Sequence, residues 1–159
     1  MYKNAKQGWY KVINSHKVIR PIDEHMQSFR LNKDGMFLNY KSSLELKCLQ
    51  YADYNKHIIK WSLEPFAIKY IKPTDNQEHR YFIDFYFEFS TGDKFLVEVK
   101  SKKETFLPKP PKNPTQKGII NHNRAMITYG INQAKWKAAH KFAHENNMQF
   151  LILTEQHLK

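Results

Sequence analysis

Two carboxylates and a lysine stand out in the stretch IDFYFEFSTGDKFLVEVK, which runs from Ile83 to Lys100. Asp84 lies among alternating aromatic residues, and Glu98 and Lys100 stand two residues apart on the segment that follows. A buried carboxylate is costly unless a partner compensates its charge. Carboxylate oxygens suit Mg²⁺, and a bound divalent cation activates water and neutralises charge on a phosphate. The pattern therefore indicates metal-assisted hydrolysis of a phosphodiester, in which Asp84 and Glu98 hold the ion. Lys100 would orient the nucleophile or stabilise the developing charge.

The loop between the two segments decides whether the carboxylates meet. A two-residue loop would place Asp84 opposite Val99, whereas the three-residue loop Ser90-Thr91-Gly92 places it opposite Glu98. Three-residue hairpins favour a left-handed residue at the third loop position, which is where Gly92 stands. We therefore predict the register that opposes Asp84 and Glu98, with Cβ atoms ~5 Å apart, where unscreened like charges repel. A hairpin at a sheet edge with solvated charges is the competing interpretation, and it does not explain a carboxylate among aromatic residues.

A third carboxylate, Glu45, stands on a predicted helix over residues 42–55. Ser42 followed by Glu45 three residues later fits a capping box. Glu45 also shares the apolar stripe of this helix with Leu49 and Cys48, the only cysteine, which is expected to be a small buried hydrophobe. Both interpretations stay open: Glu45 caps the helix, completes the metal site, or does both.

The remaining pattern predicts a single mixed α/β domain over residues 1–159, built on one central sheet. Residues 1–41 are polar and weakly periodic, which predicts an irregular arm with one short strand. Trp61 and Trp136 are expected in the core. The other expected elements are extended segments at 58–61 and 65–71, one long strand over 79–89, a strand over 94–100, a helix over 131–146 and a short buried strand over 149–154.

Charge indicates the partner. The chain has 26 Lys and Arg against 15 Asp and Glu, a net charge of +11, which favours a nucleic-acid binder over a merely soluble basic protein. Residues 101–118 hold four prolines and five lysines, which predicts a long irregular loop that holds the DNA backbone; a flexible linker is the alternative. The expected DNA-contacting residues are Lys102, Lys103, Lys109, Lys112, Lys117 and Arg80, with His79 beside Arg80. Lys135, Lys137 and Lys141 are expected on the outer side of the second helix, and His140 and His144 as a surface pair.

The sequence argues against several other classes of protein. One cysteine allows neither a disulfide framework nor a thiolate zinc site. No secretory signal is evident in MYKNAKQGWYKV, and no apolar run reaches the ~18 residues of a membrane span. We expect the cytoplasm, or a particle assembled there, as its setting.

Ile83-Asp84, Glu98-Val99-Lys100 and an upstream helical Glu45 together resemble the PD-(D/E)XK nuclease superfamily, with Ile83 in place of the proline. Four further blocks, in order, look like the head-completion nucleases of T-even-type tailed phages. They are YKSSLELK (40–47), IIKWSLEPFAIKYIKPTDNQEHRYFIDF (58–85), EVK (98–100) and NQAKWKAAHKFAHENNMQFLILTE (132–155). The resemblance implies a restriction-endonuclease-like core, a central mixed β-sheet flanked by helices. It also implies a small Mg²⁺-dependent (or Mn²⁺-dependent) DNA endonuclease that acts on packaged DNA at the capsid vertex.

The resemblance also implies a set of site residues. The catalytic set is Glu45, Asp84, Glu98, Lys100 and Gln133, and the metal set is Asp84, Glu98, Val99 and Glu45. Its implied partners are DNA and proteins of the phage head or portal vertex, in the cytoplasm of the infected host or in the virion head. The oligomeric state is open. Two alternatives remain: a non-catalytic DNA-binding virion protein on a nuclease fold, and a junction resolvase or transposase-type nuclease.

Overall fold

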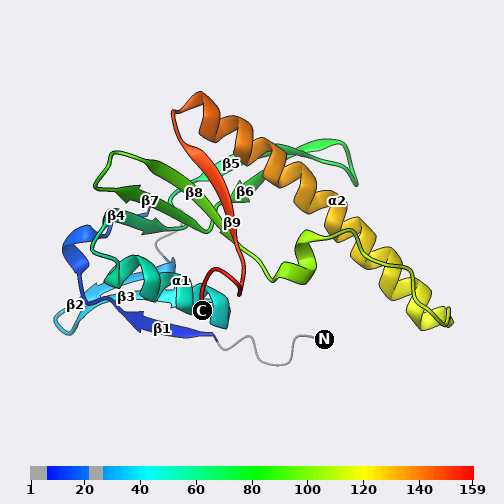
Figure 1. Cartoon of the computed structure of the whole chain (residues 1–159), viewed down its shortest axis with the longest axis horizontal. Helices are drawn as coiled ribbons and strands as arrows, with labels where there is room; N and C mark the ends of the chain where they lie inside the picture. The colour runs from blue at the N-terminus through cyan, green and yellow to red at the C-terminus, as the bar shows by residue number, and fades with distance from the viewer. Residues whose placement is uncertain (1–6, 22–26) are drawn as a thin grey trace.

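A four-stranded mixed sheet forms the centre of the molecule in the computed structural model, which describes residues 7–21 and 27–159 (Figure 1). Its strand order is β4-β7-β8-β9; β8 and β9 run parallel and the other neighbours antiparallel. The described elements are β1 (Gly8–Lys11), η1 (Ser15–Lys17), β2 (Phe29–Asn32), β3 (Gly35–Tyr40), α1 (Ser43–Tyr54), β4 (Ile58–Leu63), β5 (Ala67–Lys72), β6 (Gln77–Phe82), β7 (Phe85–Phe89), β8 (Lys94–Val99), η3 (Lys102–Thr105), α2 (Gln116–Glu145) and β9 (Gln149–Leu153).

Two hydrophobic cores lie on the two faces of this sheet. One core packs α1 and the N-terminal strands against β4, β7 and β8, with Trp61 fully buried at its centre. The other packs α2 and the β5–β6 hairpin against the opposite face, around Leu96 and Trp136. Cys48 is buried in the first core, as predicted. This arrangement confirms the mixed α/β prediction of a central sheet flanked by helices. In the part of the chain described, neither helix has the length and apolar content to cross a membrane.

The prediction of an irregular N-terminal arm was wrong for the residues described. Three short strands form an antiparallel sheet in the order β1-β3-β2, and this sheet contributes Phe29, Met36 and Leu38 to the core. Residues 1–6 and 22–26 of the predicted arm lie outside the described residues. The strands are only four to six residues long, so their alternation was too short to stand out from the sequence.

Buried polar contacts fasten the segment after β1 to the end of α1. The Lys17 ammonium donates to the carbonyl oxygens of Ala52, Asp53 and Asn55 at 2.8–3.0 Å, where the last turn of the helix lacks backbone donors. The buried Asp53 carboxylate accepts from the Tyr10 hydroxyl at 2.6 Å and from two backbone N–H groups at 2.8 Å. Burial, with the Asp53 hydrogen bond, raises the pKa of Tyr10. The N-terminal segment is thus part of the domain.

The predicted long strand over 79–89 is two strands in two different sheets. β6 pairs with β5, and β7 pairs with β4 and β8, so the chain changes sheet at Ile83 and Asp84. At this break the Asp84 carbonyl accepts a hydrogen bond from the N–H of Glu64, 2.8 Å away. The alternation continues through the break, which is why the sequence pattern did not reveal it. Asp84 therefore follows the end of one strand and precedes the start of the next.

Helix α2 begins at Gln116, fifteen residues before the predicted start, and shortens the predicted loop over 101–118. Thr115 caps it, its hydroxyl accepting from the N–H of Gly118 at 3.0 Å. Within the predicted loop, η3 also forms a regular turn. The N-terminal half of α2 extends away from the sheets, with the segment after η3 running beside it (Figure 1). We call residues 102–130, which comprise η3, the segment after it and the N-terminal half of α2, the arm. It is distinct from the predicted N-terminal arm. The last proline of the predicted loop, Pro114, directly precedes the cap Thr115. The proline-rich composition therefore placed the end of the loop, at residue 118, within a few residues of the observed helix start.

Candidate active site

The β7–β8 hairpin has the predicted register. Phe85 pairs with Val97 and Glu88 with Lys94, and the loop closes where the N–H of Phe89 donates to the Asp93 carbonyl at 2.9 Å. Gly92 has a φ of +91°, the left-handed conformation that the three-residue loop requires. Extended by one residue, this register places Asp84 across from Glu98.

Asp84 and Glu98 meet as carboxyl groups close enough to share a hydrogen bond. The Asp84 Oδ2 atom accepts from the N–H of Val99 at 2.8 Å, and the Glu98 Oε2 atom accepts from the Tyr81 hydroxyl. Glu98 is buried, with 6% of its surface exposed. Burial, followed by the charge of Glu98, raises the pKa of Asp84 well above its usual range. Burial also raises the pKa of Glu98, although Tyr81 and Lys100 oppose this shift. The pair thus brings two acidic groups together in a mostly buried place, where Tyr81 and Lys100 offset only part of the cost.

Lys100 lies on the same side of its segment as Glu98. Its ammonium nitrogen is 3.8 Å from Glu98 Oε1, and 26% of the side chain is exposed. The Lys100 backbone N–H donates to the Leu153 carbonyl of β9 at 3.0 Å, so the β8–β9 pairing continues through the lysine and fixes its position. The structure thus brings Asp84, Glu98 and Lys100 together, at a point that solvent reaches.

Glu45 stands in the first turn of α1, three residues after the cap Ser42, and lies near the pair. Its N–H donates to the Ser42 hydroxyl at 3.1 Å, as the capping pattern predicts, but its carboxylate accepts from the N–H of Lys41 at 2.8 Å. Burial raises the pKa of Glu45, and the charges of Glu64 and Glu98 add to this shift. Among the described residues, no three His, Cys, Asp or Glu side chains lie close enough together to hold a metal. The geometry brings together a pair of carboxylates with a third nearby, and a metal role for Glu45 stays a prediction.

Two other predicted site residues are placed differently. Val99 has a buried side chain, and its backbone N–H binds Asp84. Gln133 lies on α2 with its side chain exposed, beside the buried Asn132. Their roles in metal binding and catalysis stay predictions. His140 and His144 are both exposed, in agreement with a surface pair.

Lys135 is the residue near the site that the sequence analysis misplaced. It was expected on the outer side of its helix, where Lys137 and Lys141 do lie. Instead Lys135 is half-buried, and its ammonium nitrogen lies 5.6 Å from the ring centroid of Tyr81, the partner of Glu98. The helical spacing could have placed Lys135 on the inner face of α2, because it stands four residues before the buried Ala139.

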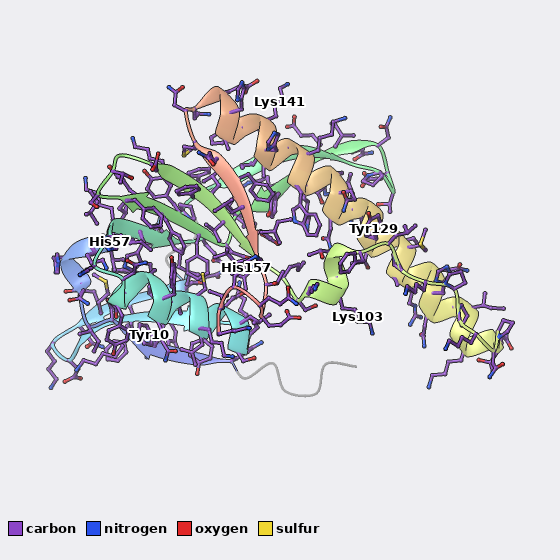
Figure 2. The ribbon with its side chains drawn as sticks, in the orientation of Figure 1. Tyr10, His57, Lys103, Tyr129, Lys141 and His157 are labelled. Carbon is purple, nitrogen blue, oxygen red and sulfur yellow. The ribbon has the colours of Figure 1, made fainter. Side chains whose placement is uncertain are left out.

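The predicted DNA-contacting lysines lie on the arm. Lys103, Lys109, Lys112 and Lys117 are exposed, and Lys102 is partly exposed. A groove of about 1040 Å³ separates the strap of residues 103–111 from α2, and Figure 2 shows Lys103 and Tyr129 on its two sides. Arg80 lies elsewhere, on the β5–β6 hairpin, with its guanidinium 5.3 Å from the Phe82 ring centroid. The arm follows Lys100 directly in the chain, so its lysines begin at the edge of the site.

Comparison with known proteins gives two matches. A family model described as TnsA-like endonuclease N terminal matches residues 55–155. The Enterobacteria phage T4 protein named head completion nuclease is 34% identical over 126 residues, which is 79% of this chain and 84% of the phage protein. The family match contains Asp84, Glu98, Lys100 and Gln133, whereas Glu45 precedes it.

Proposed function

Because this chain belongs to the family of TnsA-like endonuclease N-terminal domains, we propose that it is a metal-dependent DNA endonuclease that hydrolyses phosphodiester bonds of phage DNA. The matches confirm the resemblance to PD-(D/E)XK-type and head-completion nucleases. One observation carries the proposal: two carboxyl groups oppose one another across a hairpin, with a lysine ammonium beside them. A merely structural hairpin gains nothing from placing these like charges together.

The donor set fits a divalent ion. Asp84 and Glu98 offer hard oxygen ligands whose pKa values are raised mainly by burial, and a cation between them would remove their repulsion. Hydrogen bonds to Val99 and Tyr81 occupy one oxygen of each carboxylate and orient the other. We assign Asp84 and Glu98 as ligands of Mg²⁺ or Mn²⁺, with Glu45 and the Val99 backbone as the further members of the set. When bound, the ion supplies water activation and charge neutralisation at the phosphate.

The residues of the chain have separate tasks in this reaction. Lys100 is placed by two strands and is partly open to solvent, so its ammonium can bind a phosphate oxygen and stabilise charge that develops there. The Tyr81 hydroxyl donates a hydrogen bond to Glu98 and so holds that carboxylate in one orientation. Gln133, exposed on α2, is kept as a proposed catalytic residue because related nucleases often carry an active-site glutamine at this position.

The arm supplies most of the proposed DNA contacts. From Thr105 to His144 the sequence contains no aspartate or glutamate, so 40 consecutive residues present only positive or neutral side chains. Contacts with the phosphate backbone give affinity without sequence information. The proposed contact residues are Lys102, Lys103, Lys109, Lys112 and Lys117 on the arm, with Arg80 on the β5–β6 hairpin.

The biological setting follows from the phage relative. A nuclease that trims or cuts packaged DNA during head completion would meet its substrate at the capsid vertex, so head or portal proteins are the proposed partners. The infected host cytoplasm and the virion head are the proposed locations. We propose that residues 1–159 act as one nuclease domain, since both cores share the central sheet.

The test is plasmid cleavage in Mg²⁺ and in Mn²⁺, comparing the wild type with Asp84→Ala and Lys100→Ala. Asp93→Ala is the matched control, because Asp93 is an exposed carboxylate in the loop of the same hairpin. Cleavage by the wild type and the control, with none by the two site variants, is expected. A wild type that binds DNA but leaves it intact with every divalent metal would favour a non-catalytic virion protein instead.

A transposase-type nuclease is the second candidate, because the matching family model is named for TnsA-like endonucleases. Such an enzyme, like a junction resolvase, would prefer a particular DNA structure. Binding to four-way junctions and to linear duplexes of equal length distinguishes the two candidates. A strong preference for junctions would favour the second one.

A further inference from the structure

Lys135 is a half-buried cation without a carboxylate partner at ion-pair distance among the described residues. Its ammonium lies over two aromatic rings, 5.8 Å from the centroid of Tyr70 and 5.6 Å from that of Tyr81. Contacts of this kind stabilise a desolvated ammonium by about 0.5–2 kcal/mol and restrict where it points. The two tyrosines are themselves buried, so they hold Lys135 in a defined place next to the active site.

Three ammonium groups converge at this place. Burial lowers the pKa of Lys135; the charge of Glu98 opposes this shift, and the charges of Lys100 and Lys72 add to it. Lys72 ends β5 on the same face as Tyr70, whose ring centroid lies 5.8 Å from the Lys135 ammonium, and Lys100 follows β8, so two cations act on Lys135 from separate elements. Mutual repulsion of this kind is unfavourable unless an anion binds among the groups.

The carboxylates of the site do not fill this role. Glu98 and Asp84 act on Lys135 electrostatically, but Glu98 directs one oxygen to Tyr81 and the other toward Lys100. A lysine needed only to neutralise Glu98 would be expected to pair with it directly. The carboxylates are also the proposed metal ligands, and a bound divalent ion would neutralise them and leave the three ammonium groups uncompensated.

We propose that Lys72, Lys100 and Lys135 form a binding site for a backbone phosphate of the cleaved DNA strand, anchored by Lys135 on α2. The proposal rests on the proposed function and adds two residues to it, Lys72 and Lys135, that neither the motif nor the predicted DNA-contact set contains. Lysine binds phosphate as a point charge, so the site selects for phosphate and not for base sequence. It would position the strand so that one phosphodiester lies against Asp84 and Glu98.

The experiment measures binding of a fluorescein-labelled 20-base-pair duplex by anisotropy, in EDTA and over a series of KCl concentrations. The variants are Lys135→Met and, as the matched control, Lys137→Met, which removes an exposed charge from the same helix. For Lys135→Met we expect about tenfold weaker binding and a salt slope reduced by about 0.9, the value for one lost phosphate contact. The control should stay within about twofold of the wild type.

Two further variants distinguish loss of the phosphate site from misfolding of Lys135→Met. Lys135→Arg keeps the charge and should retain most of the affinity, and Lys72→Met leaves α2 unchanged and should also reduce the salt slope. Equal losses from Lys135→Met and Lys137→Met, or an unchanged slope in both Lys135→Met and Lys72→Met, would overturn the proposal. Wild-type cleavage in Mg²⁺ is measured in parallel. A wild type that never cuts, with Lys135 still required for binding, would reject the endonuclease and keep the phosphate site.

Discussion

Replacing Asp84 with asparagine should stabilise the metal-free protein at neutral pH while it abolishes cleavage. The wild type holds the Asp84 and Glu98 carboxyl groups against one another, whereas Asp84→Asn leaves one charge. The amide oxygen of asparagine can still accept the hydrogen bond from the N–H of Val99, so the substitution keeps the local geometry. The gain should therefore report the cost of burying the Asp84 charge together with its repulsion of Glu98.

The magnitude follows from the spacing of opposed residues. Two unit charges ~5 Å apart, at an effective dielectric constant of about 20, repel by about 3 kcal/mol. The raised pKa of Asp84 means that the folded protein takes up a proton and relieves part of this repulsion, so we expect a gain of about 1–3 kcal/mol. The direction in which the stability changes with pH follows from the linkage between proton binding and folding. Because the folded pKa lies above the unfolded one, the wild type loses stability as pH rises from about 4 through the folded pKa.

The assay is urea unfolding in EDTA at pH 5 and pH 8, with Asp93→Asn as the control for removal of an exposed carboxylate from the same hairpin. The advantage of Asp84→Asn over the wild type should be larger at pH 8. Added Mg²⁺ should stabilise the wild type more than the variant. A variant that is no more stable than the wild type at pH 8 would refute the reasoning, as would an advantage that shrinks with rising pH.

Three further substitutions test how the fold supports the site. Lys17→Met leaves three carbonyl groups at the end of α1 without their donor and should lower the free energy of unfolding by about 3 kcal/mol in urea titrations; a loss below about 1 kcal/mol would contradict the anchoring role. Ser42→Ala removes the cap that accepts from the Glu45 N–H and should cost about 1 kcal/mol by the same measurement. Gly92→Ala strains a residue with a φ of +91° and should lower stability by about 1–2 kcal/mol, seen as a reduced melting temperature, whereas an unchanged melting temperature would argue against the left-handed requirement.

The hairpin and its carboxylates were predictable because local chemistry determines them. Gly92 at the third loop position selects one register, and that register alone decides which residue faces Asp84. The cap at Ser42 was predictable for the same reason, since its partner stands three residues away. These features depend on neighbours in the chain and require no knowledge of the tertiary fold.

The features that sequence analysis missed depend on distant contacts. Nothing local marks the change of sheet at Asp84, because it depends on a hydrogen bond from Glu64. The N-terminal strands gain their stability from α1, through the contacts of Lys17 and Asp53. Lys135 was assigned to solvent because lysine usually lies there, and only the packing of Tyr70 and Tyr81 gives it another place.

The position of the proposed active site between two hydrophobic cores has a consequence for when activity would appear during synthesis. Asp84 stands between Ile83 of one core and Phe85 of the other, so a chain with only one core formed has no fixed carboxylate pair. Lys100 is held by β9, which is translated after the whole of α2. We therefore expect a ribosome-bound chain to contain every residue of the motif before it can cut, and cleavage to appear only once β9 has joined the sheet. On this reasoning, folding itself would restrain the proposed nuclease until both cores exist.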